Sequence, residues 1–201
     1  KGARYLAKAG DWARAVYANE DAIRHYERAL ATLDDCRSCN AQVHAVREAL
    51  ADLLALIGRR TDALAHYEAV RAELEMLGDG AGAARLHRKI GGLHWEAGDR
   101  ERASACFQAG LERLGENGNP IERAQLFQEM GRLGFRAGDN TGAISWAERA
   151  LAEAAAEGDD PGDLGLVARV DDEVGRVLDH ATAQGEVLVH RLAVAVADPV
   201  V

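Results

Sequence analysis

A helical pattern recurs in this sequence with a step of about forty residues, and it is clearest between residues 82 and 116. There, apolar side chains recur at the three- and four-residue spacing of one helix face, the dipeptide Gly98-Asp99 interrupts them, and a second such stripe follows. The stretch predicts two amphipathic helices joined by a tight turn. A hairpin of this kind cannot bury both stripes by itself, so copies of it must stack.

The turn residues and the first residues of the second helices keep this step through most of the chain. Turn glycines recur every forty residues, and alanines that open second helices are 41, 40 and 40 residues apart. Self-similarity at a fixed period indicates a solenoid of stacked units. These positions are Gly58, Gly98 and Gly138 in the turns and Ala22, Ala63, Ala103 and Ala143 in the second helices.

The same register predicts which side chains pack between helices. We expect the first helices to pack through Tyr5, Ala9, Trp12 and Val16, then Val46, Leu50, Leu53 and Ile57, then Leu86, Ile90, Leu93 and Ala97, and finally Leu126, Met130, Leu133 and Ala137. The second helices should pack through Ala22, Tyr26, Ala29 and Leu33, then Ala63, Tyr67, Val70 and Leu74, then Ala103, Phe107 and Gly110, and finally Ala143, Ala147 and Ala150.

These patterns predict an all-α fold, a right-handed α-solenoid of antiparallel helical hairpins. The four predicted hairpins span about 3–33, 41–77, 81–116 and 120–157. Residues 161–201 continue the register less well and are predicted to form a degenerate fifth hairpin or a capping segment of the same domain. Within them, residues 186–197 are rich in valine and compatible with either a helix or a strand.

Composition and charge limit the classes of function. Aromatic residues make up 5% of the chain and prolines number only three, which is typical of a helical protein. A formal net charge of -9 argues against general nucleic-acid binding, because phosphate neutralisation needs a basic face. No stretch approaches the roughly 18 apolar residues of a membrane span, and the first residues lack the apolar core of a signal peptide.

Cysteine content and the first residue indicate where such a chain works. Three cysteines without framework spacing fit a reducing compartment, so we expect a cytoplasmic protein. The chain begins with Lys1 and not with methionine, which indicates a piece of a longer polypeptide.

The small residues and the turn glycine of the hairpins resemble those of the tetratricopeptide repeat (TPR) family. Residues 82–116 match best, with Gly91, Gly98, Ala103, Phe107 and Gly110. The usual repeat has about 34 residues, so a forty-residue step resembles the variants with longer helices. The resemblance implies a non-catalytic scaffold that binds a protein or peptide along a concave groove lined by the first helices.

A narrower resemblance lies in residues 9–30, AGDWARAVYANEDAIRHYERAL. This stretch is similar to TPR regions that follow ATPase domains in large bacterial signalling proteins, some with nucleotide cyclase domains and others with DNA-binding regulatory domains. The resemblance implies a sensor or scaffold segment of such a protein, and it transfers no catalytic residue to this chain.

The predicted partner-binding groove combines arginine and aromatic side chains beside the packing stripes. Arginine can form two hydrogen bonds to a carboxylate and aromatic rings give rigid contact area, so an acidic peptide segment is the expected partner. The alternative is a solvated helix face that only keeps the array soluble. The predicted groove residues are Arg85, Arg88, Trp95, Gln125, Gln128, Arg132, Phe135 and Arg136.

Two further functions remain open from the sequence. Self-association or autoinhibition is one, in which residues 186–197 dock on another copy or on a neighbouring domain. Redox or metal chemistry is the other, because Cys36 and Cys39 have the spacing of a disulfide or of two zinc ligands and His44 is the nearest third ligand. A fourth ligand is not evident, so we expect unlinked cysteines, no metal, no cofactor and no enzymatic activity.

Overall fold

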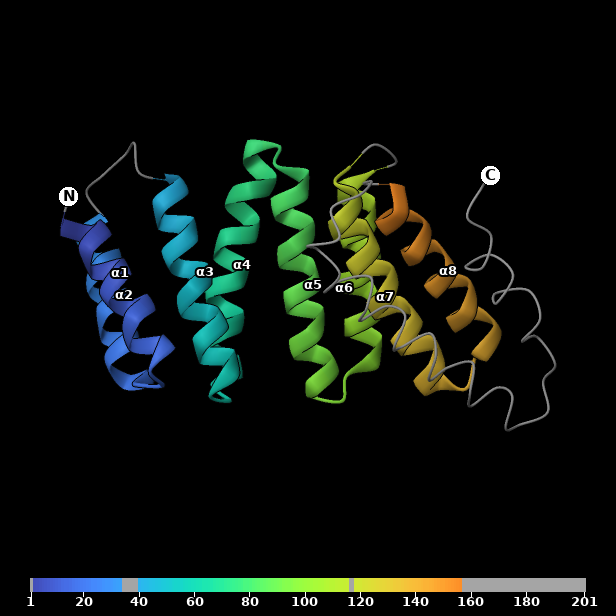
Figure 1. Cartoon of the computed structure of the whole chain (residues 1–201), viewed down its shortest axis with the longest axis horizontal. Helices are drawn as coiled ribbons and strands as arrows, with labels where there is room; N and C mark the ends of the chain where they lie inside the picture. Colours follow the sequence, from blue (N-terminus) through green and yellow to red (C-terminus); the bar gives the residue numbers. More distant parts are fainter. Residues whose placement is uncertain (1, 34–39, 116–117, 157–201) are drawn as a thin grey trace, which may run out of the picture. The chain divides into compact units, whose positions relative to one another are not determined.

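The computed structural model describes residues 2–33, 40–115 and 118–156, which form eight α-helices (Figure 1). Residues 161–201, for which a fifth hairpin or cap was predicted, lie outside the described residues, as do Cys36 and Cys39. The helices are α1 (Gly2–Ala15), α2 (Asn19–Leu33), α3 (Asn40–Leu56), α4 (Arg60–Leu77), α5 (Gly80–Glu96), α6 (Arg100–Leu114), α7 (Pro120–Ala137) and α8 (Asn140–Ala156).

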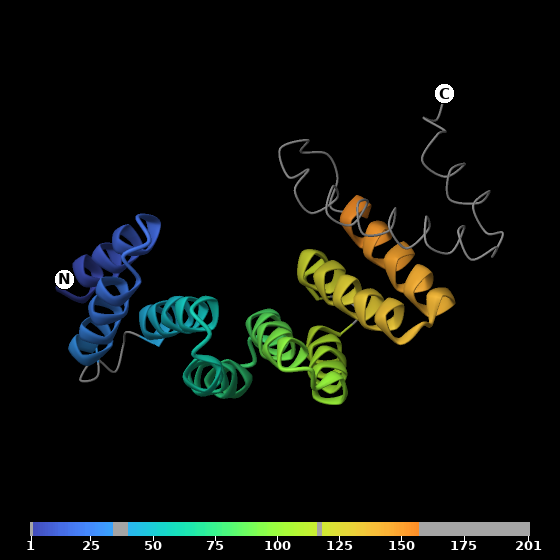
Figure 2. The same ribbon diagram turned by 90° about the horizontal axis from the view of Figure 1, so that it is seen from below.

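The chain divides within α6 into two compact units, Lys1–Cys106 and Phe107–Val201, which we call the N-terminal and C-terminal units. In the N-terminal unit, helices that follow one another in sequence pack together, α1 on α2, α2 on α3, α3 on α4 and α4 on α5 (Figure 2). In the C-terminal unit α7 packs on α8. Each unit is therefore built by neighbour-to-neighbour packing, as expected for a helical repeat.

The hairpin turns need a residue in the left-handed backbone conformation. Gly58, Gly98 and Gly138 have φ angles of 82°, 81° and 81°, which glycine adopts without steric cost. In the first hairpin the corresponding position is occupied by Tyr17, with φ of 60°. The predicted turns at the three glycines are confirmed, whereas the tyrosine was not expected in this role.

Aspartate and asparagine side chains begin several helices. The Oδ1 atom of Asp79 accepts a hydrogen bond from the backbone amide of Gly82 at 2.8 Å, and α5 starts there. Asn119 accepts in the same way from the amide of Glu122 at 3.0 Å, with Pro120 at the first position of α7. These caps satisfy backbone amides that the first turn of a helix leaves without partners.

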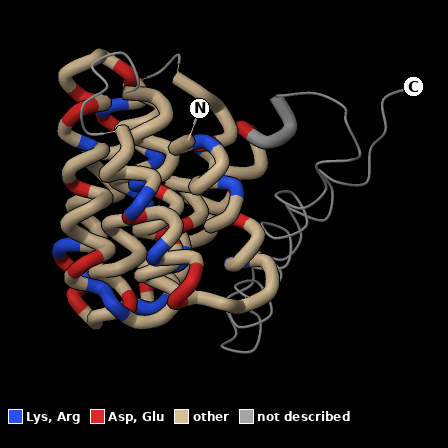
Figure 3. The backbone as a smooth tube through the Cα atoms, turned by 90° about the vertical axis from the view of Figure 1, so that its left-hand side faces the viewer, with Lys and Arg blue, Asp and Glu red and all other residues tan. Residues whose placement is uncertain are grey.

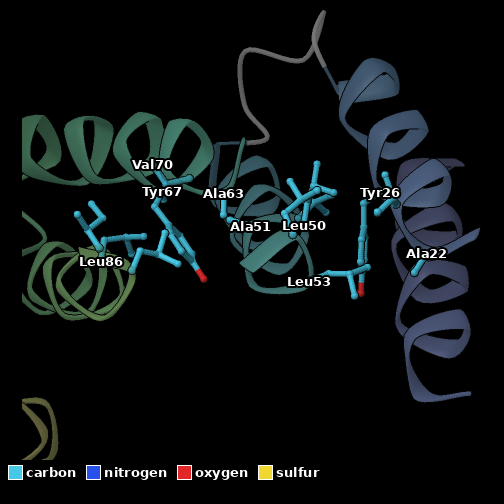
Figure 4. Packing of buried hydrophobic residues seen from close by; sticks show 14 of the residues in the cluster. Ala22, Tyr26, Leu50, Ala51, Leu53, Ala63, Tyr67, Val70 and Leu86 are labelled. Carbon is cyan, nitrogen blue, oxygen red and sulfur yellow. The ribbon is translucent and has the colours of Figure 1, made fainter. Parts of the chain in front are cut away.

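The core of the N-terminal unit repeats one arrangement. Leu50 and Leu53 of α3 face α2, where the ring of Tyr26 stands (Figure 4). Forty-one residues later, Tyr67 of α4 stands beside Leu86 of α5 in the same way (Figure 4). All five side chains are buried, which confirms the predicted stripes of α2 to α5 around these positions.

The predicted stripe of the first helix is wrong as a packing face. Tyr5, Trp12 and Val16 are 75%, 77% and 61% exposed. The inner face of α1 is instead made of small residues, among them Ala3 and Gly10, which are buried.

A difference in neighbours explains this error. Helix α3 lies between α2 and α4 and therefore buries two faces. The buried residues Val46 and Leu53 correspond to the exposed residues of α1, whereas Ala51 corresponds to Gly10. Within the described residues, α1 has only α2 as a well-packed neighbour, so only the face that contains Gly10 is covered.

In the C-terminal unit, glycines bring α7 close to α8. A Cβ atom added at Gly131 would lie 3.4 Å from the carbonyl oxygen of Ala143, and one at Gly134 would lie 3.3 Å from its amide nitrogen. Beyond them, the rings of Phe127 and Trp146 are 5.5 Å apart between centroids. The small residues therefore set the backbone separation in this hairpin.

Candidate partner-binding surface

The first helices of the N-terminal unit carry charged side chains beside their packing stripes. We call the surface formed by Arg4, Lys8, Glu48, Asp52, Arg85 and Lys89 the first-helix surface. Along it the sign of charge alternates, with basic residues on α1, acidic residues on α3 and basic residues on α5. Basic and acidic residues are likewise interspersed along the whole chain (Figure 3).

Glu48 of α3 is held by two cations from α5. Arg85 donates to it from Nε at 3.0 Å and from a terminal nitrogen at 3.2 Å, and Lys89 Nζ lies 2.8 Å from Glu48 Oε1. The Glu48 side chain is 14% exposed. Burial acts to raise the pKa of Glu48, but the hydrogen bonds from Arg85 and Lys89 outweigh it and hold that pKa below its ordinary value.

Asp52, one turn further along α3, receives a buried phenol as well as a cation. The Tyr67 hydroxyl donates to Asp52 Oδ1 at 2.6 Å, and Lys89 Nζ lies 2.6 Å from the same oxygen. The Lys89 ammonium also lies 5.6 Å from the centroid of the Tyr67 ring. Burial and the hydrogen bond to Asp52 raise the pKa of Tyr67, so the phenol remains a donor.

A second tyrosine–aspartate pair occupies the corresponding place in the first hairpin. The Tyr26 hydroxyl donates to Asp11 Oδ1 at 2.8 Å, and both partners lie 41 residues before Tyr67 and Asp52. Burial and the hydrogen bond to Asp11 raise the pKa of Tyr26 in the same direction.

The two later repeats lack both members of the pair. The aspartate and tyrosine positions correspond to Gly92 and Phe107 in the third repeat, and to Arg132 and Ala147 in the fourth. Because a buried hydroxyl needs an acceptor, the loss of the carboxylate together with the hydroxyl is consistent with the energetics of such pairs.

A pocket of about 300 Å³ opens between α1 and α3 on the first-helix surface. Arg4 and Lys8, four residues apart on α1, are exposed at it, and among the described residues neither forms a salt bridge. Two cations beside an apolar floor suit a carboxylate-bearing side chain. The remaining lining residues are Ala7, Asp11, Tyr26, Gln42, Ala45, Val46 and Ala49.

Three of the predicted groove residues lie on α5. Arg85 is engaged with Glu48 as described above, and Arg88 is half-buried. Trp95 is also half-buried, with the guanidinium carbon of Arg100 5.9 Å from the ring centroid. These side chains therefore already have intramolecular contacts, in contrast to Arg4 and Lys8.

The other five predicted groove residues lie on α7, in the C-terminal unit. Arg132 pairs with Glu129 at 3.1 Å, and Phe135 packs against the cluster of Ala143 and Ile144. Gln125 and Gln128 are half-buried, and Arg136 is exposed. Since the predicted set is split between the two units, each half is a separate surface here.

Sequence reasoning missed the pocket beside Arg4 and Lys8. The available signal was their four-residue spacing, which puts them on one face of α1, off the stripe that contains Ala3 and Gly10. That signal was masked because Tyr5 and Trp12 were assigned to the packing face.

Among the residues offered for redox or metal chemistry, only His44 and Cys106 can be placed. His44 is buried, and its Nε2 atom lies 2.6 Å from Glu73 Oε2. Cys106 is half-buried beside the core of the N-terminal unit, and burial raises the pKa of its thiol. Within the ranges that the structure describes, no three His, Cys, Asp or Glu side chains are grouped as metal ligands.

None of the described helices has the length and apolar character needed to cross a membrane.

Known structures share this arrangement of helices. BtubC (BKLC) from P. vanneervenii aligns with a TM-score of 0.72 and 22% identity, over 90% of this chain and 72% of that chain. Aspartyl phosphate phosphatase F from Bacillus subtilis aligns with a TM-score of 0.74 and 12% identity, over 90% of this chain and 50% of that chain. MamA protein aligns with a TM-score of 0.59 and 16% identity, over 92% and 84%. No protein-family model and no curated protein matches the sequence.

These structures are helical-repeat proteins of the tetratricopeptide type, so the chain has a TPR-type fold of the all-α solenoid class. The chain spans about half the length of the phosphatase. At these identities the likeness is one of fold.

Proposed function

We propose that the chain is a non-catalytic scaffold that binds an acidic segment of a protein partner on the first-helix surface of its N-terminal unit. The observation that supports this most directly is the pair of exposed cations, Arg4 and Lys8, at a pocket of about 300 Å³. The TPR-type fold adds support, because stacked hairpins offer an extended surface on which several modest contacts add up. In this proposal the chain belongs to a larger cytoplasmic bacterial signalling protein.

The alternating charges suggest how a partner would lie on this surface. An acidic side chain would contact Arg4 and Lys8, and a neighbouring apolar side chain would enter the pocket toward Ala45 and Ala49. Past α3, Arg85 and Lys89 already neutralise Glu48 and Asp52, so they offer less to a second acidic group. The strongest selectivity for acidic residues is therefore expected over α1. The groove residues predicted on α7, with Arg132 and Arg136, remain a separate candidate contact.

The test uses a fluorescein-labelled peptide rich in glutamate and leucine, and its counterpart with lysine in place of every glutamate. Fluorescence anisotropy with the intact chain should show binding of the acidic peptide and much weaker binding of the basic one. Replacing both cations, Arg4→Glu with Lys8→Glu, should weaken acidic-peptide binding by roughly tenfold or more.

A matched control is available on α2. Arg24→Glu with Arg28→Glu makes the same charge change at the same four-residue spacing, away from the pocket. It should reduce binding only slightly, through the general field of the protein. Equal losses in the two double variants would refute a site at Arg4 and Lys8, as would equal binding of the two peptides.

A further inference from the structure

The outer face of α1 and the turn after it form an apolar surface that goes beyond the proposed peptide site. We call Tyr5, Trp12, Val16 and Tyr17 the α1 outer stripe. Tyr17 is 84% exposed, and the other three are exposed as given above. Single exposed apolar residues are common, but four large ones on one helix and its turn are typical of an interaction surface.

The register of the repeat shows what kind of element covers such a stripe. Tyr5 corresponds to Val46 and Leu86, whose exposed fractions are 4% and 0%. Trp12 corresponds to Leu53 and Leu93, at 0% and 7%. On α3 the stripe faces α2, and on α5 it faces α4 (Figure 4). The element that belongs on the α1 outer stripe is therefore the second helix of another hairpin.

Tyr17 adds a second observation at the same place. A tyrosine with φ of 60° takes the turn position that glycine holds in the later hairpins, at a cost of about 1 kcal/mol. Its ring is exposed, so packing within the described residues does not repay that cost. An aromatic residue here instead extends the contact area of the stripe.

Charge indicates the chemistry of the occupant. The exposed basic residues of α1 are Arg4, Lys8 and Arg14. Its one acidic residue, Asp11, already accepts the hydrogen bond from Tyr26. A net basic helix with an apolar stripe favours an apolar helix set in acidic surroundings.

The chain contains such a segment itself. Residues 157–201 carry ten acidic residues and three basic ones. Forty residues after Ala143 and Ala147, the second-helix register continues at Ala183 and Val187. Seven residues further, Val194 keeps the same helix face.

We propose that the α1 outer stripe binds residues 183–197 of a second copy of this chain, head to tail, so that hairpins of successive copies stack as hairpins within one copy do. Contacts of this heterologous kind leave one unoccupied face at each end of the assembly. The assembly should therefore grow with protein concentration.

The test exploits that asymmetry with full-length variants. Trp12→Glu damages the stripe and leaves the segment intact, whereas V187E/V194E damages the segment and leaves the stripe intact. Each variant alone should be monomeric by light scattering, with self-association weakened by roughly thirtyfold or more. An equimolar mixture should form a one-to-one dimer, because each variant retains one intact face.

The control is Met76→Glu on α4, which introduces the same charge at a residue that is 80% exposed. It should associate as the wild type does. A wild type that stays monomeric at high concentration would overturn the proposal, and so would a mixture that stays monomeric. Trp12→Glu protein that associates normally would also overturn it. Dimers of V187E/V194E alone, absent in Trp12→Glu, would indicate a contact between two α1 stripes and would likewise contradict it. Circular dichroism of each variant verifies that its helices are retained.

Discussion

Tyr67 on α4 donates its hydroxyl to Asp52 on α3 at 2.6 Å, which joins the two helices of one hairpin by a hydrogen bond at the edge of the core. Lys89 of the next hairpin contacts the same carboxylate oxygen, so one aspartate connects three helices. The pair thus couples the stability of a hairpin to the stacking of the hairpin after it.

Tyr67→Phe should lower the free energy of unfolding by about 1 kcal/mol, because the hydrogen bond is lost while the ring still packs. Asp52→Ala should cost more, since it leaves a buried hydroxyl without its acceptor and removes a partner of Lys89. Urea denaturation followed by circular dichroism measures both. In the double variant the effects should add to less than their sum, by roughly 1 kcal/mol; strict additivity would mean that the two groups do not interact.

Glu48 predicts how the protein responds to acid. Its folded-state pKa lies below the ordinary value of 4.5, so its ionised form stabilises the fold above about that pH. This contribution is lost as pH falls from 4.5 through the lower folded-state pKa. Glu48→Gln should therefore show a smaller drop in Tm between neutral pH and pH of about 3 than the wild type. Glu27→Gln, on the exposed side of α2, serves as the control and should follow the wild type. Parallel Tm curves for wild type and Glu48→Gln would contradict the role of this carboxylate.

Tyr17→Gly should stabilise the protein by about 1 kcal/mol, because glycine adopts φ near 60° without the steric cost of a side chain. Thermal denaturation should show a higher Tm. Tyr17→Ala separates the causes, since it removes the ring but keeps a Cβ atom in the left-handed conformation. Its stability should stay close to that of the wild type. Destabilisation by the glycine would show that the tyrosine ring is packed in solution.

Two glycines in equivalent secondary structure should respond in opposite directions to alanine. A Cβ atom at Gly10 would lie 2.5 Å from Tyr26 Cε1, and that ring is buried and held by Asp11. Gly10→Ala should therefore destabilise by roughly 1–3 kcal/mol. At Gly92, in the middle of α5, a Cβ atom meets nothing within 4 Å, so Gly92→Ala should stabilise by roughly 0.5–1 kcal/mol. Urea midpoints of the two variants should shift in opposite directions; shifts of the same sign would contradict the packing at Tyr26.

The forty-residue register predicted most of the core, because each stripe residue reports a local helical spacing. Residues such as Tyr26, Leu53 and Leu86 are buried as expected. The same spacing placed Trp12 on a packing face, yet it is exposed. An apolar stripe shows that a helix has a face to bury, but whether a neighbour covers it depends on the stacking of whole hairpins.

The binding surface was harder to predict because charge pairing is a property of stacked helices. Arg85 has the same sequence features as Arg4, but Glu48, 37 residues earlier, reaches it across two helices. No local pattern contains that distance. The exposed pair, Arg4 and Lys8, is identified only once the salt bridges of the other cations are known.

The stacking of α2 on α3 and of α4 on α5 has a consequence for how such a chain can change its length. The same stripe positions meet the same tyrosine positions at each step, at Leu53 with Tyr26 and at Leu86 with Tyr67. One hairpin can therefore stand in for another at a junction. Gain or loss of a whole forty-residue unit preserves the contacts on both sides of the junction, whereas a change of a few residues inside a helix misaligns every stripe that follows within that helix. The array is modular in the unit of the hairpin, not of the residue.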